Sequence, residues 1–191
     1  TLANVRFQKR FDRLPEILTA TQSLLPQEVH LLLAGQGTET LPLPPRAHAL
    51  GLQADIGSVL AACDVLVSAS DHEGLSLAQL EALAAGKIVV ATEVGGTSEV
   101  PGITLVPADA APAQFAEAIK SALARDRPSF PKSFTRHAMA RRAQWLYPRV
   151  LVRPTAASGI LLVCNNFSVG GAQSSARRLL TQLAARGISV R

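Results

Sequence analysis

The chain has 191 residues, of which 48% are apolar and only 17% are charged, and its formal net charge is +5. This composition argues against an intrinsically disordered chain, and no apolar run approaches the ~20 residues that a membrane-spanning helix requires. The positive charge suits an anionic partner. However, basic and aromatic residues do not alternate as an RNA-binding surface requires, so we expect no nucleic acid partner.

The predicted elements of the first 125 residues alternate between strands and helices. Short apolar runs predict strands at 1–5, 28–35, 64–70, 87–92 and 103–107. Helical spacing of apolar residues predicts helices at 10–25, 55–63, 76–86 and 111–125. Apolar strands that are each followed by a helix indicate an α/β fold with a Rossmann-like, doubly wound parallel sheet. Ligands of such sheets bind at the carboxyl ends of the strands, and the predicted rim consists of the loops 6–10, 35–40, 70–76 and 92–98.

The pattern of predicted elements changes after residue 126. A basic helix is predicted at 134–152, and the segment 153–158 is typical of a linker. A further strand at 160–166 and a helix at 174–187 then form one extra βα unit, and 188–191 begins another strand. This unit cannot bury both of its faces alone.

Several common site types are missing from the sequence. The loop 35–40 lacks the third glycine of a dinucleotide fingerprint, because that position is Thr40. No Walker loop or nucleophile elbow is present. The histidines are scattered without metal-ligand spacing, at His30, His48, His72 and His137. Cys63 and Cys164 are too few for a disulfide framework, and we expect buried, reduced thiols.

The stretch "SDHEGLSLAQLEALAAGKIVVATEVGG" at 70–96 places two carboxylates around the start of a helix. Ser70 ends a strand, Glu73 lies in the loop, and Ser76 is a candidate N-cap for the helix that carries Glu81. Ionised carboxylates accept hydrogen bonds from vicinal hydroxyls, as in a sugar or a ribose. Spacing alone leaves open that both glutamates are merely solvated charges.

The backbone of the same stretch suits a phosphate. The N–H groups of Gly74, Leu75 and Ser76 are expected to point out of the helix N-terminus, which favours anions. Gly74 allows close approach of a ligand to the backbone. The stretch therefore predicts a site for a phosphorylated sugar or nucleotide.

This string closely resembles the C-terminal domain of the retaining GT-B glycosyltransferases called glycosyl transferases group 1. That family carries Ser-x-x-Glu-Gly, then Glu-Ala-x-Ala-x-Gly, and, after a strand, Gly-Gly-x-x-Glu. The matching positions are Ser70, Glu73, Gly74, Glu81, Ala82, Ala84, Gly86, Gly95, Gly96 and Glu99. The resemblance covers about residues 1–152. It departs from the family at 40–52, which is short and without a predicted helix.

The first loop also resembles the family. Lys9 matches the lysine that neutralises the donor diphosphate, with a plain basic loop as the alternative. Asn4 stands where the family has an arginine, and Arg6 is the candidate for the missing cation. The resemblance implies catalytic roles for Glu73 and Lys9 and a ribose contact for Glu81. The implied donor-binding set is Arg6, Lys9, Gly74, Leu75, Ser76, Glu81, Gly95, Gly96, Gly170 and Gly171.

The tail resembles the beginning of a GT-B N-terminal domain. Gly170 and Gly171 match its glycine loop, although an ordinary βα turn is the alternative. The resemblance implies a C-terminal nucleotide-sugar-binding domain at 1–152, a linker at 153–158 and a fragment of an N-terminal domain at 159–191. That order suggests a piece of a tandem glycosyltransferase, or else a rearranged or proteolysed chain.

The resemblance implies a hexosyl-type glycosyltransferase that needs no cofactor and no metal. Its donor is a nucleotide-diphosphate sugar of the UDP or GDP type, and its acceptor is a glycan or a lipid-linked molecule. The expected pathways are polysaccharide, lipopolysaccharide or glycolipid biosynthesis. The alternatives are a non-catalytic nucleotide-sugar-binding module of a larger tandem enzyme and an epimerase of GT-B type. Either way, this piece need not be active alone.

The expected location is the cytoplasm, and contact with the inner face of a membrane is a further expectation. The helix at 134–149 carries Arg136, Arg141, Arg142 and Arg149, with Trp145 and Tyr147 between them. Such helices can rest on acidic lipid surfaces. A solvated basic helix that packs through its apolar residues is the alternative.

Overall fold

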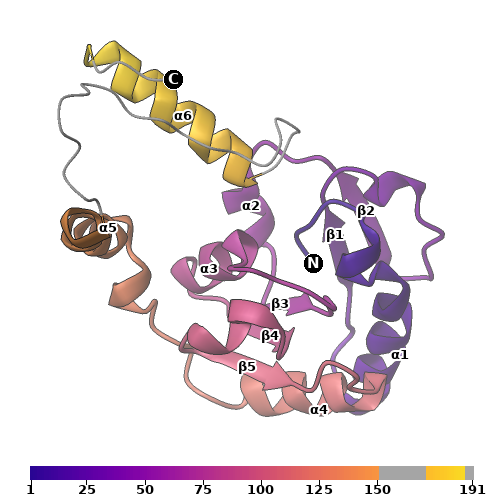
Figure 1. The fold of residues 1–191 in the computed structure, drawn as a ribbon. Coiled ribbons are helices and arrows are strands. Elements are labelled where there is room, and N and C mark those ends of the chain that lie inside the picture. The colour runs from indigo at the N-terminus through magenta and orange to yellow at the C-terminus, as the bar shows by residue number, and fades with distance from the viewer. Residues whose placement is uncertain (151–170, 188–191) are drawn as a thin grey trace. The chain divides into compact units, whose positions relative to one another are not determined.

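The computed structural model describes residues 1–150 and 171–187, apart from the side chains of 147–150 and 171–177 (Figure 1). Its internal contacts form two units, Thr1–Met139 and Ala140–Arg191. The linker predicted at 153–158, the strand at 160–166 and Gly170 lie outside the described residues, as does the strand start at 188–191. The predicted domain boundaries therefore stay a prediction.

The strands of the first unit are all parallel, as the sequence predicted. β1 (Leu31–Ala34) pairs with β2 (Ala47–Gly51). β4 (Ile88–Thr92) lies between β3 (Val65–Ser68) and β5 (Ile103–Val106). β2 was not predicted, because its residues Ala47–Gly51 follow three prolines in a stretch with little β-branched character.

The strand predicted at 1–5 forms only an isolated bridge, between Leu2 and Ala34. Ala3 N donates to Ala34 O at 2.9 Å, and Ala34 N donates to Thr1 O at 3.0 Å. On the other side, Thr1 Oγ1 donates to Val67 O of β3 at 2.7 Å. The segment therefore connects the β1–β2 pair with the β3–β4–β5 sheet.

Helices cover both faces of this sheet (Figure 1). α1 (Leu14–Leu24) packs against α4 (Pro112–Leu123), and α4 also contacts β4 and β5. α3 (Leu77–Ala84) packs on β3 and β4, and shares its apolar cluster with α2 (Ile56–Ala61). This arrangement confirms the predicted α/β fold with helices on both sides of a parallel sheet.

Strand β4 shows why the sequence indicated a sheet buried on both faces. Every residue of β4 is buried. Ile88 and Val90 belong to the apolar cluster of α1 and α4, whereas Val89 and Ala91 belong to the cluster of α2 and α3. Because successive side chains of a strand point to opposite faces, a continuous apolar run serves two cores at once.

Local signals set the helix ends. Pro15 and Pro112 occupy the first turns of α1 and α4, where a missing N–H costs nothing. Asp55 caps α2 by accepting from Ser58 N at 3.1 Å. Gly86 follows α3 with a φ of +68°, the left-handed conformation that glycine adopts freely.

The remaining elements are short 3-10 turns and two helices. The turns span Phe7–Lys9, Phe11–Arg13, Thr38–Thr40, Gly95–Glu99 and Lys132–Phe134. α5 (Arg136–Val150) and α6 (Gly171–Ala185) correspond to the two helices predicted after residue 126. Within the described residues, no helix combines the length and the apolar character needed to cross a bilayer.

Candidate functional site

Two predicted catalytic residues meet at the carboxyl edge of the sheet. Lys9 Nζ donates to Glu73 Oε1 at 2.6 Å, although the two residues are 64 positions apart in the sequence. The Glu73 side chain is nearly buried, and that of Lys9 is 26% exposed. The two loops join because they follow neighbouring segments, the N-terminal segment and β3, which are linked by the hydrogen bond from Thr1 to Val67. The result is a charge pair with one open side.

Glu73 is held from a second direction as well. Ser70 Oγ donates to the same carboxylate oxygen, Oε1, at 2.8 Å. Ser70 is in turn fixed by Thr92, whose Oγ1 donates to the Ser70 carbonyl at 2.5 Å. Among the described residues, all hydrogen bonds to the Glu73 side chain end on Oε1. Oε2 is therefore the oxygen that remains available to a ligand hydroxyl.

The start of α3 offers backbone donors beside this carboxylate. Ser76 occupies the predicted N-cap position, but its hydroxyl does not cap the helix. No described residue accepts a hydrogen bond from the N–H groups of Gly74, Leu75 or Ser76. Free amides at a helix N-terminus, together with the Lys9 ammonium, favour an anion such as a phosphate.

The glycine pair of the motif supports the loop that carries Glu73. Gly96 N donates to Gly74 O at 2.9 Å. A Cβ atom on Gly95 would lie 1.6 Å from Glu73 O, and one on Gly96 would lie 2.4 Å from Gly74 O. A side chain at either position would displace the Glu73–Gly74 backbone. The described geometry thus gives Gly95 and Gly96 a supporting contact, and their contact with a donor stays a prediction.

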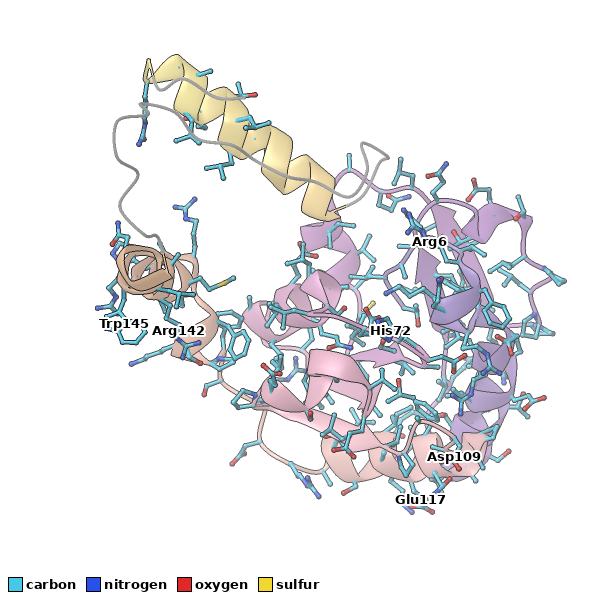
Figure 2. The ribbon with its side chains drawn as sticks, viewed as in Figure 1. Arg6, His72, Asp109, Glu117, Arg142 and Trp145 are labelled. Atoms are coloured by element: carbon cyan, nitrogen blue, oxygen red, sulfur yellow. The ribbon has the colours of Figure 1, made fainter. Side chains whose placement is uncertain are left out.

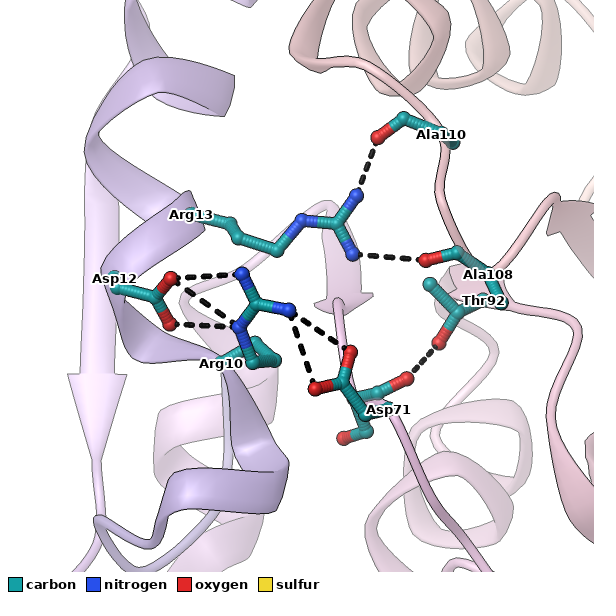
Figure 3. A network of polar contacts seen from close by, with 8 residues as sticks. Arg10, Asp12, Arg13, Asp71, Thr92, Ala108 and Ala110 are labelled. Carbon is teal, nitrogen blue, oxygen red and sulfur yellow. Dashed lines mark hydrogen bonds and ion pairs between the residues drawn. The ribbon is translucent and has the colours of Figure 1, made fainter.

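A second charge network joins the same two loops at the surface (Figure 3). Arg10 donates to both oxygens of Asp71 at 3.1 Å and to Asp12 at 3.0 Å. These hydrogen bonds raise the pKa of the Arg10 guanidinium, and Arg10 lowers the pKa of the Asp12 carboxyl. Asp71 N also donates to Gln8 O at 2.9 Å. Arg10 therefore keeps the loop of Lys9 against the loop of Glu73.

Arg13 fixes the opposite end of this region. Its guanidinium donates to the carbonyls of Ala108, at 3.1 Å, and Ala110 (Figure 3). The same group lies over the Phe115 ring, 5.4 Å from its centre. These contacts attach the start of α1 to the loop that leads into α4.

Other predicted site residues do not join the Lys9–Glu73 pair. Arg6 is exposed, and no hydrogen bond or ion pair links its side chain to a described residue (Figure 2). Asn4 accepts from Gln36 N at 3.0 Å and so holds the loop at 35–40. Glu81 is exposed on α3 without a partner among the described side chains. Gly171 is the first residue of α6, and a donor contact of Gly170 or Gly171 stays a prediction.

The structure also shows residues that the sequence did not single out. His30 Nδ1 and His48 Nε2 are 3.0 Å apart, so these two histidines are paired rather than scattered. The unpredicted strand β2 brings them together. Nevertheless, the described residues contain no group of three or more metal-ligating side chains. Cys63 is a free, half-buried thiol rather than a buried one.

Gln79 is the other residue that sequence reasoning missed. It belongs to the buried face of α3, and its side chain is 1% exposed. The sequence did contain a signal for it. Gln79 is an amide on the helix face that also carries Leu80, Ala82 and Leu83.

Comparisons with known proteins agree with this fold. The family model described as glycosyl transferases group 1 matches residues 2–125. The chain is 26% identical to HepE (Alr3699) of Anabaena in complex with UDP-glucose, with a TM-score of 0.52 over 64% of this chain and 38% of that one. It is also 26% identical to sucrose-phosphate synthase of Thermosynechococcus elongatus, with a TM-score of 0.56 over 78% of this chain and 44% of that one.

A third solved structure shares the fold. This is the C-terminal domain of LpcC, a glycosyl transferase group 1 family protein of Francisella tularensis, with 23% identity and a TM-score of 0.52. The match covers 65% of this chain and 73% of that domain. No curated protein matches the chain. The chain spans less than half the length of HepE and of sucrose-phosphate synthase.

Proposed function

Because the chain belongs to the glycosyl transferases group 1 family, we propose that it forms the donor-binding half of an enzyme that takes a sugar from a nucleotide-diphosphate sugar. The observation that carries this proposal is the Lys9–Glu73 pair beside the free amides of Gly74–Ser76. That arrangement offers positive charge for a diphosphate and a carboxylate oxygen for a sugar hydroxyl at one place.

In the proposed mechanism, the diphosphate gains negative charge as the bond to the sugar breaks. Lys9 and the amides at the start of α3 stabilise that charge, because these groups are already in place. Oε2 of Glu73 accepts from a sugar hydroxyl and orients the anomeric carbon. Glu81, on the exposed side of α3, accepts from the ribose hydroxyls. Arg6 is the candidate for a second cation at the diphosphate.

We propose a UDP-sugar as the first donor to test, since HepE binds UDP-glucose. Retention of configuration and a glycan or lipid-linked acceptor are part of the same proposal, and both rest on the family resemblance. The acceptor site belongs to regions of the parent enzyme outside the domain at 1–152. The complete parent protein is therefore the right material for a transfer assay, with the anomeric configuration of the product read by NMR.

The donor site itself can be tested on this chain. Thermal unfolding is measured with UDP, GDP, ADP and their glucose conjugates, with Glu81→Ala as a binding-deficient variant. A ligand at ~100 times its dissociation constant adds about 2.7 kcal/mol of stability. We expect one nucleotide to raise the melting temperature in the wild type and to do so less in the variant. Equal melting temperatures with and without every ligand would contradict a donor site in this chain.

The basic helix α5 carries a separate proposal, namely contact with an anionic lipid surface. Arg136, Arg141 and Arg142 are exposed, and so are Met139 and Trp145. Figure 2 labels Arg142 and Trp145. Basic side chains with an interfacial aromatic favour acidic headgroups. Co-sedimentation with phosphatidylglycerol vesicles, but not with phosphatidylcholine vesicles, is expected. Equal recovery with both lipids would contradict the proposal.

A further inference from the structure

A small hollow is lined by both residues of the Lys9–Glu73 pair. It is bounded by the start of α3, by β3 and by the first residues of the chain. Its polar walls are formed by Thr1, Lys9, Ser68, Ser70, Glu73, Ser76 and Gln79. Its cavity volume is about 10 Å³. This is about the volume that one water-sized group needs.

The amide of Gln79 is the unexplained group in this hollow. Gln79 is 1% exposed, and among the described residues neither Nε2 nor Oε1 has a hydrogen-bond partner. A buried amide without partners destabilises the fold, and native proteins seldom contain one. The amide therefore needs a partner that comes from outside the described chain.

Packing alone does not account for a glutamine here. The neighbours on the buried face of α3 are Leu80, Ala82 and Leu83, which all belong to the buried part of the helix. A leucine at position 79 would occupy a similar volume without an unpaired polar group. Glu81, two residues on, lies on the exposed side of α3, so Gln79 faces away from the proposed ribose contact and toward Glu73.

We propose that Gln79 is a specificity-determining residue of the proposed donor site, and that its amide binds a hydroxyl group of the donor sugar that enters the hollow beside Glu73. This inference rests on the proposed function. A hydroxyl has the size of a water molecule and can both donate to Oε1 and accept from Nε2. The hollow has room for one such group.

The charges around the hollow select the class of sugar. Lys9 and Glu73 already neutralise each other, and Gln79 is uncharged. Lys9 pairs with Glu73 and, in the proposed site, also binds the diphosphate, so a further carboxylate in this space would lie beside Glu73 without a side-chain cation of its own. The donor is therefore a neutral hexose with free hydroxyls rather than a uronic acid.

The test compares Gln79→Leu with the wild-type chain by isothermal titration calorimetry. The probes are UDP and UDP-glucose, followed by the GDP and ADP pairs. Gln144→Leu is the matched control, because Gln144 is exposed on α5. In Gln79→Leu, we expect an unchanged dissociation constant for the nucleotide and a roughly tenfold higher one for its glucose conjugate, the size of one lost hydrogen bond. Gln144→Leu is expected to change neither value.

The outcomes separate this inference from the proposed function. If Gln79→Leu preserves the wild-type ratio of the two affinities, Gln79 does not contact the sugar and the inference fails alone. If the wild type binds none of the nucleotides or conjugates, the proposed donor site fails and the inference fails with it. A readout without ligand completes the test. Gln79→Leu is expected to unfold at or above the wild-type temperature, and a clear decrease would mean that Gln79 has a structural partner instead.

Discussion

Gly95→Ala is expected to destabilise the chain by displacing the backbone of Glu73. The added Cβ would lie 1.6 Å from Glu73 O, whereas real Cβ contacts essentially never fall below 3.0 Å, so the two segments must separate by at least the 1.4 Å difference. Gly95 also has a φ of +51°, and an alanine in that conformation costs roughly 1–2 kcal/mol. Overpacking in a rigid site adds roughly 1–3 kcal/mol. The expected loss of stability is the sum, about 2–5 kcal/mol.

Thermal unfolding by circular dichroism measures this loss. At roughly 3 °C per kcal/mol for a chain of this size, the melting temperature should decrease by about 6–15 °C. Gly74→Ala is the matched control, because its Cβ would meet no protein atom within 4 Å. We expect Gly74→Ala to unfold within about 2 °C of the wild type but to bind UDP more weakly, since the new methyl group occupies open space next to the N–H groups that are proposed to bind the diphosphate. Equal melting temperatures for the two variants would refute the reasoning.

Three further predictions concern charged groups. Lys9→Met should weaken UDP binding at least about tenfold, because a charge-assisted hydrogen bond is lost, and should lower the melting temperature, because the nearly buried Glu73 loses its counter-charge. The double variant Lys9→Met with Glu73→Gln should regain the melting temperature but not UDP binding. Unfolding curves measure the first and calorimetry the second, and any other combination of results would contradict this prediction. Glu81→Ala should weaken UDP binding without a change in the melting temperature, because Glu81 is exposed; a decrease in stability would assign it a structural role. Arg10 lowers the pKa of Asp12, so this contribution to stability is present above the usual Asp pKa and is lost as the pH falls through the lowered value. Between about pH 6 and pH 2, the free energy of unfolding should therefore fall less steeply for Arg10→Met than for the wild type. An equal dependence on pH in the two proteins would contradict this linkage.

The elements that depend on local patterns could be predicted from the sequence alone. The apolar run of β4 predicted a strand buried on both faces, and Gly86 predicted the end of α3. The family motif placed Glu73 at the edge of the sheet, where the structure has it. These features follow from side-chain alternation and from glycine conformation, which short stretches of sequence encode directly.

The contacts between distant segments were not predictable in the same way. β2 lacks a strand-like composition and exists because β1 offers it a parallel edge, and the His30–His48 contact depends on that pairing. The hydroxyl of Ser76 leaves the N-cap bond unmade, although its position was predicted correctly. Gln79 is read from sequence as one residue of an amphipathic helix, and only its packing shows that the amide is buried and unpaired.

The two oxygens of Glu73 have different surroundings, and this difference fits the layout of the proposed site. Lys9 and Ser70 both donate to Oε1, which fixes the carboxylate in place before any ligand arrives. In the proposed site, Oε2 accepts from the ligand while the carboxylate is already held in position, so no binding energy is spent on ordering it. Lys9 contacts Glu73 through one of three ammonium hydrogens, and the other two can donate to a diphosphate at the same time. Under the proposed function, a single lysine orients the carboxylate and neutralises the donor, and the hydrogen bonds of Arg10 hold the two loops together for that purpose.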